Sequence, residues 1–385
     1  MGNKKDRWAS SSDEEEDSKS RRPKSKKLKK SRNTTNTVAN NNNSSQSTES
    51  STSHLPLHNP LSQGCRSVYD TYEQISRVSE GTYGIVWKAR DLATNDTVAL
   101  KQIKFHVDSQ KEGFPVIALR EINLLMALSH ESIVSVQEMV VGSAFDKVFM
   151  VMEWFEFDLK MGIDRFEGAL LQAELKSILQ QILSGTAHMH NKWYLHRDLK
   201  TSNILVHRSG RIALADFGLA RQYSDPPRAM TQLVCTLWYR APELLFGECR
   251  YGPAVDMWSI ACIFGELIRK DAVLKGEGEL DQIDQIFALV GTATDENWPS
   301  FSDLPNAGLF RWKPTKKDAI LLPQKFPIAA PVSAKEAFLD QNGYHLLQSL
   351  FTLDPAQRMT AAQALEHPYL REGVAPKTPR FFSAS

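Results

Sequence analysis

The chain has 385 residues, a hydrophobic content of 42% and a formal net charge of +1 at pH 7. A chain of this size can support about two lobes, so its core is feasible without disulfides. Its four cysteines form no CxxC pair and no metal-ligand spacing, which argues against a zinc site and suits a reducing intracellular compartment. The sequence shows no secretory signal or membrane span, and Asp6 stands where a myristoylation motif requires Ser or Thr.

Residues 1–65 differ in composition from the rest of the chain. They contain 12 Lys or Arg and 7 Asp or Glu, and positions 33–53 are almost wholly Asn, Ser and Thr. Such a segment cannot bury enough apolar surface to offset the entropy of ordering it, so we expect a disordered basic tail. Its basic run over 21–30 is typical of a nuclear-import signal or a nucleic-acid contact, and a merely solvated charged tail is the third interpretation.

The hydrophobic patterns of the remaining chain predict an α+β fold with two lobes. Residues 69–152 alternate short β-rich runs with one helical stretch over 114–127, and residues after 160 carry longer helical patterns such as 171–191. We therefore expect a small β-rich N-lobe, a larger helical C-lobe, and a connection between them at 153–157. No internal repeat is found.

A glycine turn stands between the first two strand-like stretches of the small lobe. Gly81 and Gly84 would let the backbone lie over nucleotide phosphates, although this motif alone is a weak signal. Lys101 ends the buried-strand pattern that begins at Val98, and Glu121 falls on the predicted helix, where it can hold that lysine. Taken singly, each of these two charges is more often a solvated surface group.

The segment His196 to Asn203 reads HRDLKTSN and is followed, after a short gap, by Asp216 in Asp-Phe-Gly. Phosphoryl transfer needs a carboxylate beside the incoming hydroxyl and metal ions that neutralise the charge on the transferred group. Asp198 fits the first role. Asn203 and Asp216 fit the second, because Mg²⁺ prefers oxygen ligands and keeps several waters.

Lys200 would steady the same phosphate during transfer. An HRD or a DFG tripeptide alone also occurs by chance in unrelated proteins, where the Asp and Asn residues usually cap helices or sit in turns. Downstream, Ala241-Pro242-Glu243 closes the segment that begins at Asp216, and Arg358 is a candidate buried partner of Glu243. With all these parts in order, the sequence predicts a protein kinase that uses ATP and Mg²⁺.

Residues 69–371 resemble a cyclin-dependent protein kinase, and most specifically the PITSLRE subgroup, with 372–385 left as a short C-terminal tail. The resemblance is carried by Pro115 to Glu121 (PVIALRE), Lys111 to Phe114, Val141 to Ser143, Asp146-Lys147, Thr201-Ser202, Ala254 to Ser259 and Cys262 to Leu267.

The resemblance implies a bilobal protein kinase fold with ATP between the lobes. Val86 and Ala99 would lie above the adenine, Leu205 below it, and Met152 at its back. The full set of residues expected at the nucleotide is Val78, Gly81, Gly84, Val86, Ala99, Lys101, Glu121, Met152, Glu153, Phe155 and Leu205.

The resemblance also implies regulation by a cyclin, with an L-type cyclin suspected, that presses on the helix carrying Glu121. Thr231 matches the activation-loop phosphoacceptor, and an activating kinase would modify it. Arg120, Arg197 and Arg221 would converge on its phosphate. An ordinary loop threonine beside surface arginines is the alternative. Thr82 and Tyr83 match a pair that inhibitory kinases modify in relatives, and whether this happens here is open.

Substrate choice follows from the same family pattern. Thr236 would bridge Asp198 and Lys200, and Val234-Cys235 with Arg240 would shape the pocket for the residue after the phosphoacceptor, so Ser-Pro and Thr-Pro substrates are expected. Two residues depart from the pattern. Ser79 replaces the first loop glycine, and Cys235 replaces a common valine, which would loosen the proline preference or expose a thiol.

Other functions are weighed against this one. A mitogen-activated kinase shares the architecture, but Gln232 and Leu233 follow Thr231 in place of a Thr-x-Tyr motif. A cyclin-binding pseudokinase scaffold is opposed by the intact catalytic set, and binding of nucleic acid is expected only through the basic tail. A nuclear location is expected, with the cytoplasm as a second one, and a role in transcription, RNA processing or the cell cycle. The sequence leaves open whether Thr378-Pro379 in the C-terminal tail is itself phosphorylated.

Overall fold

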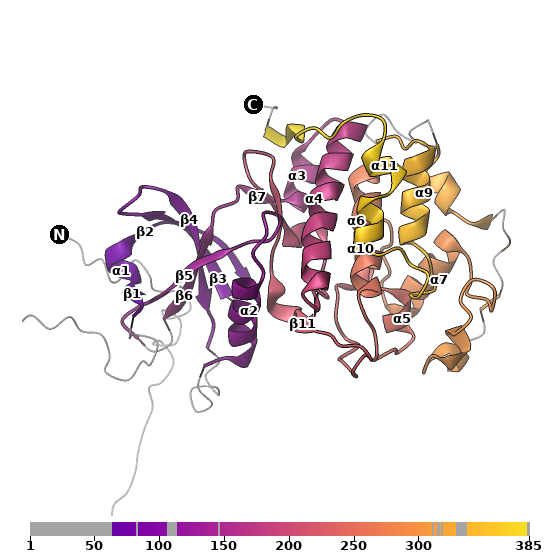
Figure 1. The fold of residues 1–385 in the computed structure, drawn as a ribbon, viewed down its shortest axis with the longest axis horizontal. Coiled ribbons are helices and arrows are strands. Elements are labelled where there is room, and N and C mark those ends of the chain that lie inside the picture. Colours follow the sequence, from indigo (N-terminus) through magenta and orange to yellow (C-terminus); the bar gives the residue numbers. More distant parts are fainter. Residues whose placement is uncertain are drawn as a thin grey trace, which may run out of the picture.

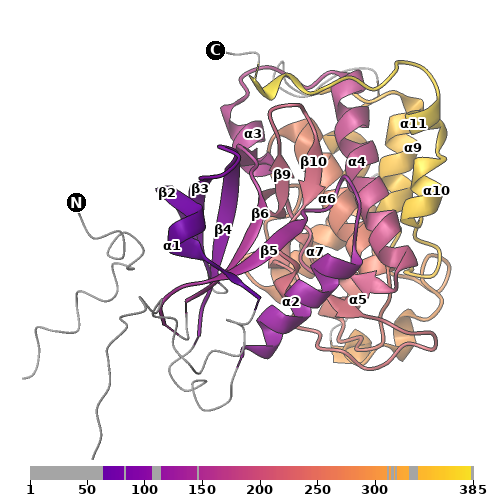
Figure 2. The same ribbon diagram turned by 60° about the vertical axis from the view of Figure 1, so that its left-hand side comes forward.

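The computed structural model describes residues 64–81, 84–105, 114–144, 147–309, 312–313, 316, 319–328 and 337–382. A small lobe built on a sheet stands beside a larger helical lobe (Figures 1 and 2). The predicted α+β fold with two lobes is confirmed. Residues 1–63 of the basic tail and the pair Thr82 and Tyr83 lie outside the described residues.

The small lobe is a six-stranded sheet with the strand order β1-β5-β6-β4-β3-β2. Its neighbouring strands are antiparallel except β1 and β5, which are parallel. Arg66 and Ser67 therefore already belong to this sheet. The elements are β1 (Arg66–Ser67), α1 (Val68–Thr71), β2 (Tyr72–Gly81), β3 (Gly84–Asp91), β4 (Thr97–Ile103), α2 (Val116–Ala127), β5 (Val136–Val141) and β6 (Val148–Glu153).

Helix α2 begins at Val116, two residues after the start that the sequence predicts. Pro115 is its N-cap and has an extended backbone, with φ −57° and ψ 121°. A proline also disfavours helical geometry at the residue before it, so Phe114 cannot begin the helix.

The register of the sheet decides which side chains share a face. Val86 lies opposite Lys101, and Ala99 lies opposite Met152. Directly opposed residues of an antiparallel pair point to the same face, and residues two apart on one strand also share a face. Val86, Ala99, Lys101 and Met152 therefore lie on one face. The alternating residues build the core of this lobe, namely Trp87, Ala89, Val98, Leu100 and Val151 with Val68, Tyr72, Ile85, Val140 and Phe149.

The large lobe packs around α6, a helix with an almost fully buried surface. Fourteen of its residues, from Val255 to Ile268, are buried, as expected of a helix that is apolar on nearly all sides. Two small sheets, β10-β9-β7 and β11-β8, lie where this lobe meets the small one. The helices and strands are β7 (Phe157–Asp158), α3 (Leu159–Arg165), α4 (Gln172–Asn191), β8 (Tyr194–Leu195), β9 (Ile204–Val206), β10 (Ile212–Leu214), β11 (Arg221–Gln222), α5 (Pro242–Leu245), α6 (Ala254–Arg269), α7 (Glu279–Val290), α8 (Leu322–Lys325), α9 (Gln341–Leu350), α10 (Ala361–Leu365) and α11 (Pro368–Arg371). The 3-10 helices are η5 (Thr201–Asn203), η6 (Phe217–Leu219), η7 (Leu237–Tyr239), η8 (Phe301–Asp303), η9 (Ala307–Leu309) and η11 (Arg380–Phe382).

A buried ion pair joins α5 to the segment before α10. Arg358 donates to Glu243 through Nη1 at 2.7 Å and Nη2 at 2.9 Å, and both side chains are almost completely shielded from solvent. The predicted partnership of these two residues is confirmed. Among the described helices, none is long and apolar enough for a membrane crossing.

Candidate active site

The catalytic loop is fixed from below by a carboxylate on α6. Asp256 is fully buried and accepts the backbone N–H groups of His196 and Arg197 at 2.9 Å each, and it contacts His190 Nε2 at 2.9 Å. Burial alone would raise the pKa of the Asp256 carboxyl, but the His190 hydrogen bond and nearby positive charge hold this pKa below its ordinary value. An ionised Asp256 therefore holds the start of the loop.

Asp198 lies at the centre of a closed set of hydrogen bonds. Its Oδ2 accepts from Lys200 Nζ at 2.9 Å and Asn203 Nδ2 at 3.0 Å. Its Oδ1 accepts from the backbone nitrogen and Oγ1 of Thr236, both at 3.1 Å. Lys200 also donates to Thr236 Oγ1 at 3.0 Å. The catalytic loop and the activation segment are thus locked together at the carboxylate proposed as the base.

Asn203 and Asp216 together offer oxygen atoms suited to a hard cation. The amide nitrogen of Asn203 donates to Asp198, which leaves its amide oxygen as the free ligand atom. Asp216 has a left-handed backbone with φ 60°, and its side chain is 41% exposed. In the described part of the chain no cluster of three or more His, Cys, Asp or Glu could hold a metal. An ion here would therefore complete its shell with phosphate and water oxygens, as Mg²⁺ usually does.

Lys101 of β4 reaches across to α2. Its Nζ lies 2.6 Å from Glu121 Oε1 and 3.8 Å from Asp216 Oδ1. Glu121 is buried. The lysine thus joins the small lobe to the start of the activation segment, where it can meet nucleotide phosphates.

The two loop glycines lie at the adjoining ends of two paired strands. Gly81 of β2 lies opposite Gly84 of β3. A Cβ at Gly84 would clash with the backbone oxygen of Gln102 on β4. Close approach of β4 therefore requires a glycine at this position.

The connection between the lobes is braced from the β9–β10 turn. Arg211 contacts Glu153, and its guanidinium lies 5.0 Å from the ring of the buried Phe155. Below the connection, Asp158 of β7 pairs with Leu205 of β9. Of the remaining residues predicted at the nucleotide, Ala99 is buried, Val86 and Met152 are half-buried, and Val78 is 52% exposed.

The three arginines expected at a phosphorylated Thr231 lie near one another. Burial, together with the charges of Arg120 and Arg197, lowers the pKa of Arg221. Thr231 itself is exposed. Its carbonyl accepts from Tyr251 Oη at 2.6 Å, and that hydroxyl accepts from Arg197 Nη1 at 2.8 Å. The role of Tyr251 could not be predicted from the sequence, because its contacts with Thr231 and Arg197 join residues far apart along the chain.

Arg240 donates hydrogen bonds to two backbone oxygens of the activation segment. It donates to Val234 O at 2.9 Å and to Cys235 O at 3.1 Å. Cys235 has a left-handed backbone with φ 62°, and its side chain is buried. Burial raises the pKa of this thiol well above its ordinary value. The expectation of an exposed thiol is therefore wrong, because the side chain packs into the core of the large lobe.

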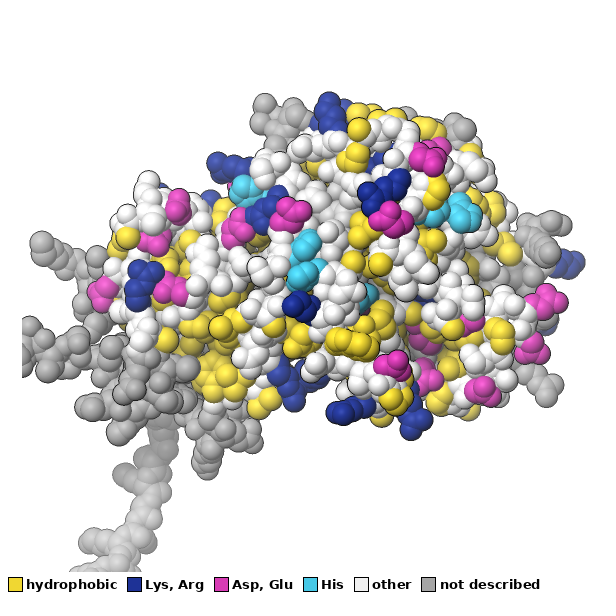
Figure 3. Space-filling model, in the orientation of Figure 1, with side chains coloured by type: hydrophobic (Ala, Val, Ile, Leu, Met, Phe, Trp, Pro, Cys, Tyr) yellow, Lys and Arg dark blue, Asp and Glu magenta, His cyan; other side chains and the backbone are white. Residues whose placement is uncertain are grey.

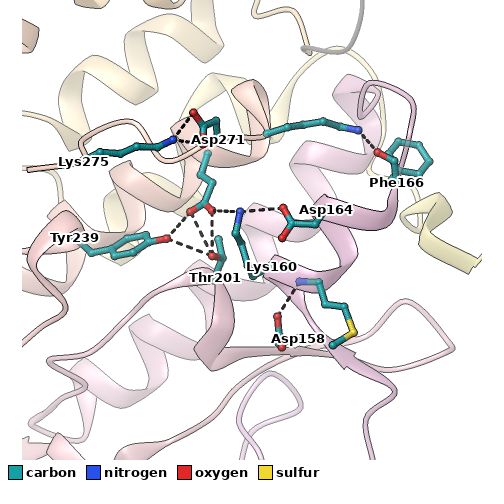
Figure 4. Close-up of polar contacts among 11 residues, drawn as sticks. Asp158, Lys160, Asp164, Phe166, Thr201, Tyr239, Asp271 and Lys275 are labelled. Atoms are coloured by element: carbon teal, nitrogen blue, oxygen red, sulfur yellow. Dashed lines mark hydrogen bonds and ion pairs between the residues drawn. The ribbon is translucent and has the colours of Figure 1, made fainter.

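A buried carboxylate that the sequence did not indicate contacts Thr201 of the catalytic loop, and Figure 4 draws its contacts with Thr201, Tyr239 and Lys160. Glu266 of α6 accepts from Tyr239 Oη at 2.6 Å and from Thr201 Oγ1 at 3.3 Å. Lys160 of α3 lies 3.4 Å away and also pairs with Asp164 at 2.9 Å. A Glu inside the apolar run of α6 is the signal that could have found it, since a buried charge needs partners.

Helix α2 exposes a group of large apolar side chains, most of them on the side away from Glu121. Figure 3 shows hydrophobic side chains gathered over this helix. The exposed residues are Val116, Ile117, Leu119 and Met126, of which Met126 is 73% exposed. Such a group on a surface marks an interaction site.

Comparison with known proteins identifies a family and several similar kinases. The family described as Protein kinase domain matches residues 72–370. The chain is 45% identical over 320 residues to cyclin-dependent kinase G-2 of Oryza sativa subsp. indica, covering 83% of this chain and 44% of the rice protein. It is 45% identical over 325 residues to serine/threonine-protein kinase ppk23 of Schizosaccharomyces pombe, covering 84% and 78%. It is 42% identical over 328 residues to cyclin-dependent kinase 11B of Mus musculus, covering 85% and 40%. The chain thus spans less than half the length of the rice and mouse relatives.

Proposed function

The chain belongs to the protein kinase family and, within it, to the cyclin-dependent kinases of the PITSLRE subgroup, and from this premise we propose that it phosphorylates Ser-Pro and Thr-Pro sites of other proteins. The observation that carries the proposal is the closed set of bonds joining Asp198, Lys200 and Thr236. This set holds a carboxylate, an ammonium group and a hydroxyl at one point, as phosphoryl transfer requires.

In the proposed reaction, Asp198 orients the substrate hydroxyl and takes its proton. Lys200 places a positive charge beside the same point and neutralises the group in transfer. Thr236 holds Oδ1 of Asp198 in place, so the carboxylate does not have to reorganise during the reaction.

Nucleotide binding is assigned to the face of the sheet that carries Lys101. Protein kinases use ATP with a divalent metal, and we assign Mg²⁺ here, with Asn203 and Asp216 as its protein ligands. When bound, the ion neutralises charge on the phosphates. Val86, Ala99 and Leu205 would enclose the adenine, and Lys101, held by Glu121, would meet the phosphates.

A preference for proline follows from the hydrogen bonds of Arg240. Both backbone oxygens at Val234 and Cys235 are already engaged by its guanidinium. An ordinary residue after the phosphoacceptor would bring a backbone N–H with no acceptor, which costs about 1–3 kcal/mol. Proline has no such N–H.

The test is a pair of peptides that differ only in Pro or Ala after the phosphoacceptor serine. The kcat/KM of the cyclin complex should favour the proline peptide by about 10- to 100-fold, from the cost of one unpaired N–H. The substitution Arg240→Met frees the backbone oxygens of Val234 and Cys235. It should therefore lower the ratio of kcat/KM for the proline peptide to kcat/KM for the alanine peptide. Equal kcat/KM for both peptides would overturn the substrate assignment.

A cyclin is the proposed partner of the exposed apolar side of α2. A cyclin bound to this side would hold Glu121 against Lys101. Helix α2 would then have two positions, and the cyclin would favour the one in which the pair is formed. An L-type cyclin is proposed from the PITSLRE resemblance alone.

Phosphorylation of Thr231 by an activating kinase would add a dianion for Arg120, Arg197 and Arg221, so Thr231→Ala should lower the kcat of the cyclin complex about tenfold or more. Unchanged kcat would contradict this role.

The cellular setting is proposed from the family resemblance. A nuclear kinase acting in transcription, RNA processing or cell-cycle control fits the PITSLRE resemblance. The basic tail, as a nuclear-import signal or nucleic-acid contact, stays a prediction, as does inhibitory modification of Thr82 and Tyr83.

A further inference from the structure

The chain after α11 crosses the N-terminal end of α4 toward the side of α3 (Figures 1 and 2). In both ribbon views it crosses from α11 to the side of α3 (Figures 1 and 2). Residues 372–381 are called the C-terminal strap below. Lys176 Nζ donates to Glu372 O at 2.7 Å and to Val374 O at 3.2 Å, and Lys377 N donates to Ala173 O at 2.9 Å. The strap is thus held on the first turns of α4, at positions 173–176.

The end of the strap is anchored on a buried carboxylate. Arg380 donates to Glu174 through its backbone nitrogen at 2.9 Å, Nε at 2.7 Å and Nη2 at 3.0 Å. Glu174 is completely buried. Phe381 then makes edge contacts with the rings of Phe157 and Phe166, at 6.2 and 6.0 Å between centroids.

The strap contacts two elements next to the proposed nucleotide site, namely β7 and the β9–β10 turn. Phe157 belongs to β7, which pairs with the strand carrying Leu205. Thr378 packs against Gly210 so closely that a Cβ at that glycine would clash with Thr378 Cγ2. Gly210 lies in the β9–β10 turn, where Arg211 contacts Glu153 of the connection.

We propose that Thr378 is a phosphorylation site of this kinase and that its phosphate keeps the C-terminal strap off the helical lobe. The inference rests on the proposed function, because Thr378-Pro379 is a Thr-Pro pair. In the docked strap Thr378 is exposed, whereas Pro379 is buried. A substrate groove that reads both residues can therefore take only a lifted strap.

The modification step uses ATP as the phosphoryl donor. A bond forms between Thr378 Oγ1 and the γ-phosphorus, the bond from that phosphorus to the bridging oxygen breaks, and ADP leaves. The hydroxyl proton passes to the Asp198 carboxylate of the acting active site and then to solvent.

The phosphate opposes redocking through charge. It adds a dianion two residues from Arg380, where it competes with Glu174 for the guanidinium. In the docked strap, Thr378 also lies between Lys377, bonded to Ala173 O, and Arg380, bonded to Glu174. Redocking would therefore bring the dianion toward an unneutralised carboxylate.

The experiment measures phosphate on Thr378 by mass spectrometry after the cyclin complex is incubated with ATP and a Ser-Pro peptide in the same tube. Glu174→Gln removes the charge that anchors Arg380, while its amide oxygen can still accept the Leu171 N–H that caps α4. It should speed Thr378 phosphorylation about fivefold without changing the sequence around Thr378. Glu167→Gln is the matched control at an exposed position and should leave the rate unchanged.

The second measurement is amide hydrogen exchange over 377–380, where two N–H groups donate to α4 residues. Phosphorylated protein should exchange about tenfold faster there, and Thr378→Val, which keeps the packed methyl group, should show no change after incubation with ATP. Peptide phosphorylation without phosphate on Thr378, an equal rate in Glu174→Gln, or unchanged exchange would each overturn the inference. If the peptide is also unmodified, the proposed function fails and the inference falls with it.

Discussion

Thr236 makes both contacts at Oδ1 of Asp198, one from its backbone and one from its hydroxyl. The hydroxyl also accepts from Lys200. Without it, the backbone contact remains, but the carboxylate and the ammonium group lose the atom that joins them. The side chain of Thr236 is therefore expected to act on the chemical step and not on nucleotide binding.

Thr236→Val keeps the shape of the side chain and removes the hydroxyl. We expect kcat to fall about 100-fold with KM for ATP little changed, because a misplaced base loses rate in the chemical step. Thr236→Ser restores the hydroxyl and should return most of kcat. Steady-state kinetics of the two variants in the cyclin complex provide the measurement, and a Val variant with the kcat of the wild type would remove this role.

At the residue scale, the proximity of the candidate catalytic groups was predictable, because the proposed chemistry requires their spacing. Asp198, Asn203 and Asp216 stand in short motifs with few alternatives. Tyr251 and Glu266 were not predictable, since each acts through a contact far along the chain, and one sequence does not show which distant residues meet.

At the scale of elements, Arg358 ties α5 and α6 to the segment before α10. Besides Glu243, it donates to Ala254 O at 2.7 Å. Removing the cation leaves Glu243 buried and unpaired. This is the costly way to break a buried pair, because the remaining charge has lost both water and partner.

Arg358→Met should lower the free energy of unfolding by about 3–5 kcal/mol. Arg371→Met is the matched control, since Arg371 and Glu366 are 56% and 70% exposed and such pairs contribute about 1 kcal/mol or less. Chemical denaturation of the three proteins provides the comparison. Equal losses for the two variants would contradict the assignment of Glu243 and Arg358 as a buried structural pair.

The N-cap of helix α11, His367, is a group whose charge depends on pH. His367 accepts from the Tyr369 N–H at the start of the helix and contacts His345 at 2.9 Å. Burial, with His345 beside it, lowers the pKa of His367 below its ordinary value of 6.5. The unfolded chain therefore takes up a proton as the pH falls below about 6.5 while the folded chain resists it, and unfolding becomes more favourable.

His367→Asn retains an acceptor at this cap and removes the titrating group. Its free energy of unfolding should fall less between about pH 7.5 and 5.5 than that of the wild type. Urea unfolding at the two pH values gives both differences. A variant that loses as much stability as the wild type over this range would show that His367 does not supply the pH dependence.

The elements themselves were largely predictable from hydrophobic period and turn residues. The helix over 171–191 differs from α4 by one residue, whereas the start of α2 shifted because Pro115 holds an extended backbone. The path of the C-terminal strap was not predictable. It depends on Glu174 and Lys176 of α4, whose contacts with the strap join residues about 200 positions apart.

At the scale of the whole molecule, the two lobes bring Lys101 and Glu121 from the sheet side to the catalytic loop and Asp216 on the helical side. The structure shows the paired arrangement, with Lys101 2.6 Å from Glu121. The exposed apolar side of α2 lies on the same helix as Glu121, so the proposed partner would act directly on the pair. The proposed cyclin dependence would thus be a property of the whole assembly and not of one motif.

The most direct measurement is transfer of phosphate from ATP to a Ser-Pro peptide by the chain alone, by its complex with co-purified cyclin, and by the same complex carrying Asp198→Asn. We predict transfer by the cyclin complex, little by the chain alone, and loss of at least about 100-fold in the Asp198→Asn complex, because general base catalysis contributes roughly that much or more. Transfer that survives in Asp198→Asn, or a stable cyclin complex that transfers no phosphate, would contradict a cyclin-dependent kinase, and the latter result would identify a scaffold.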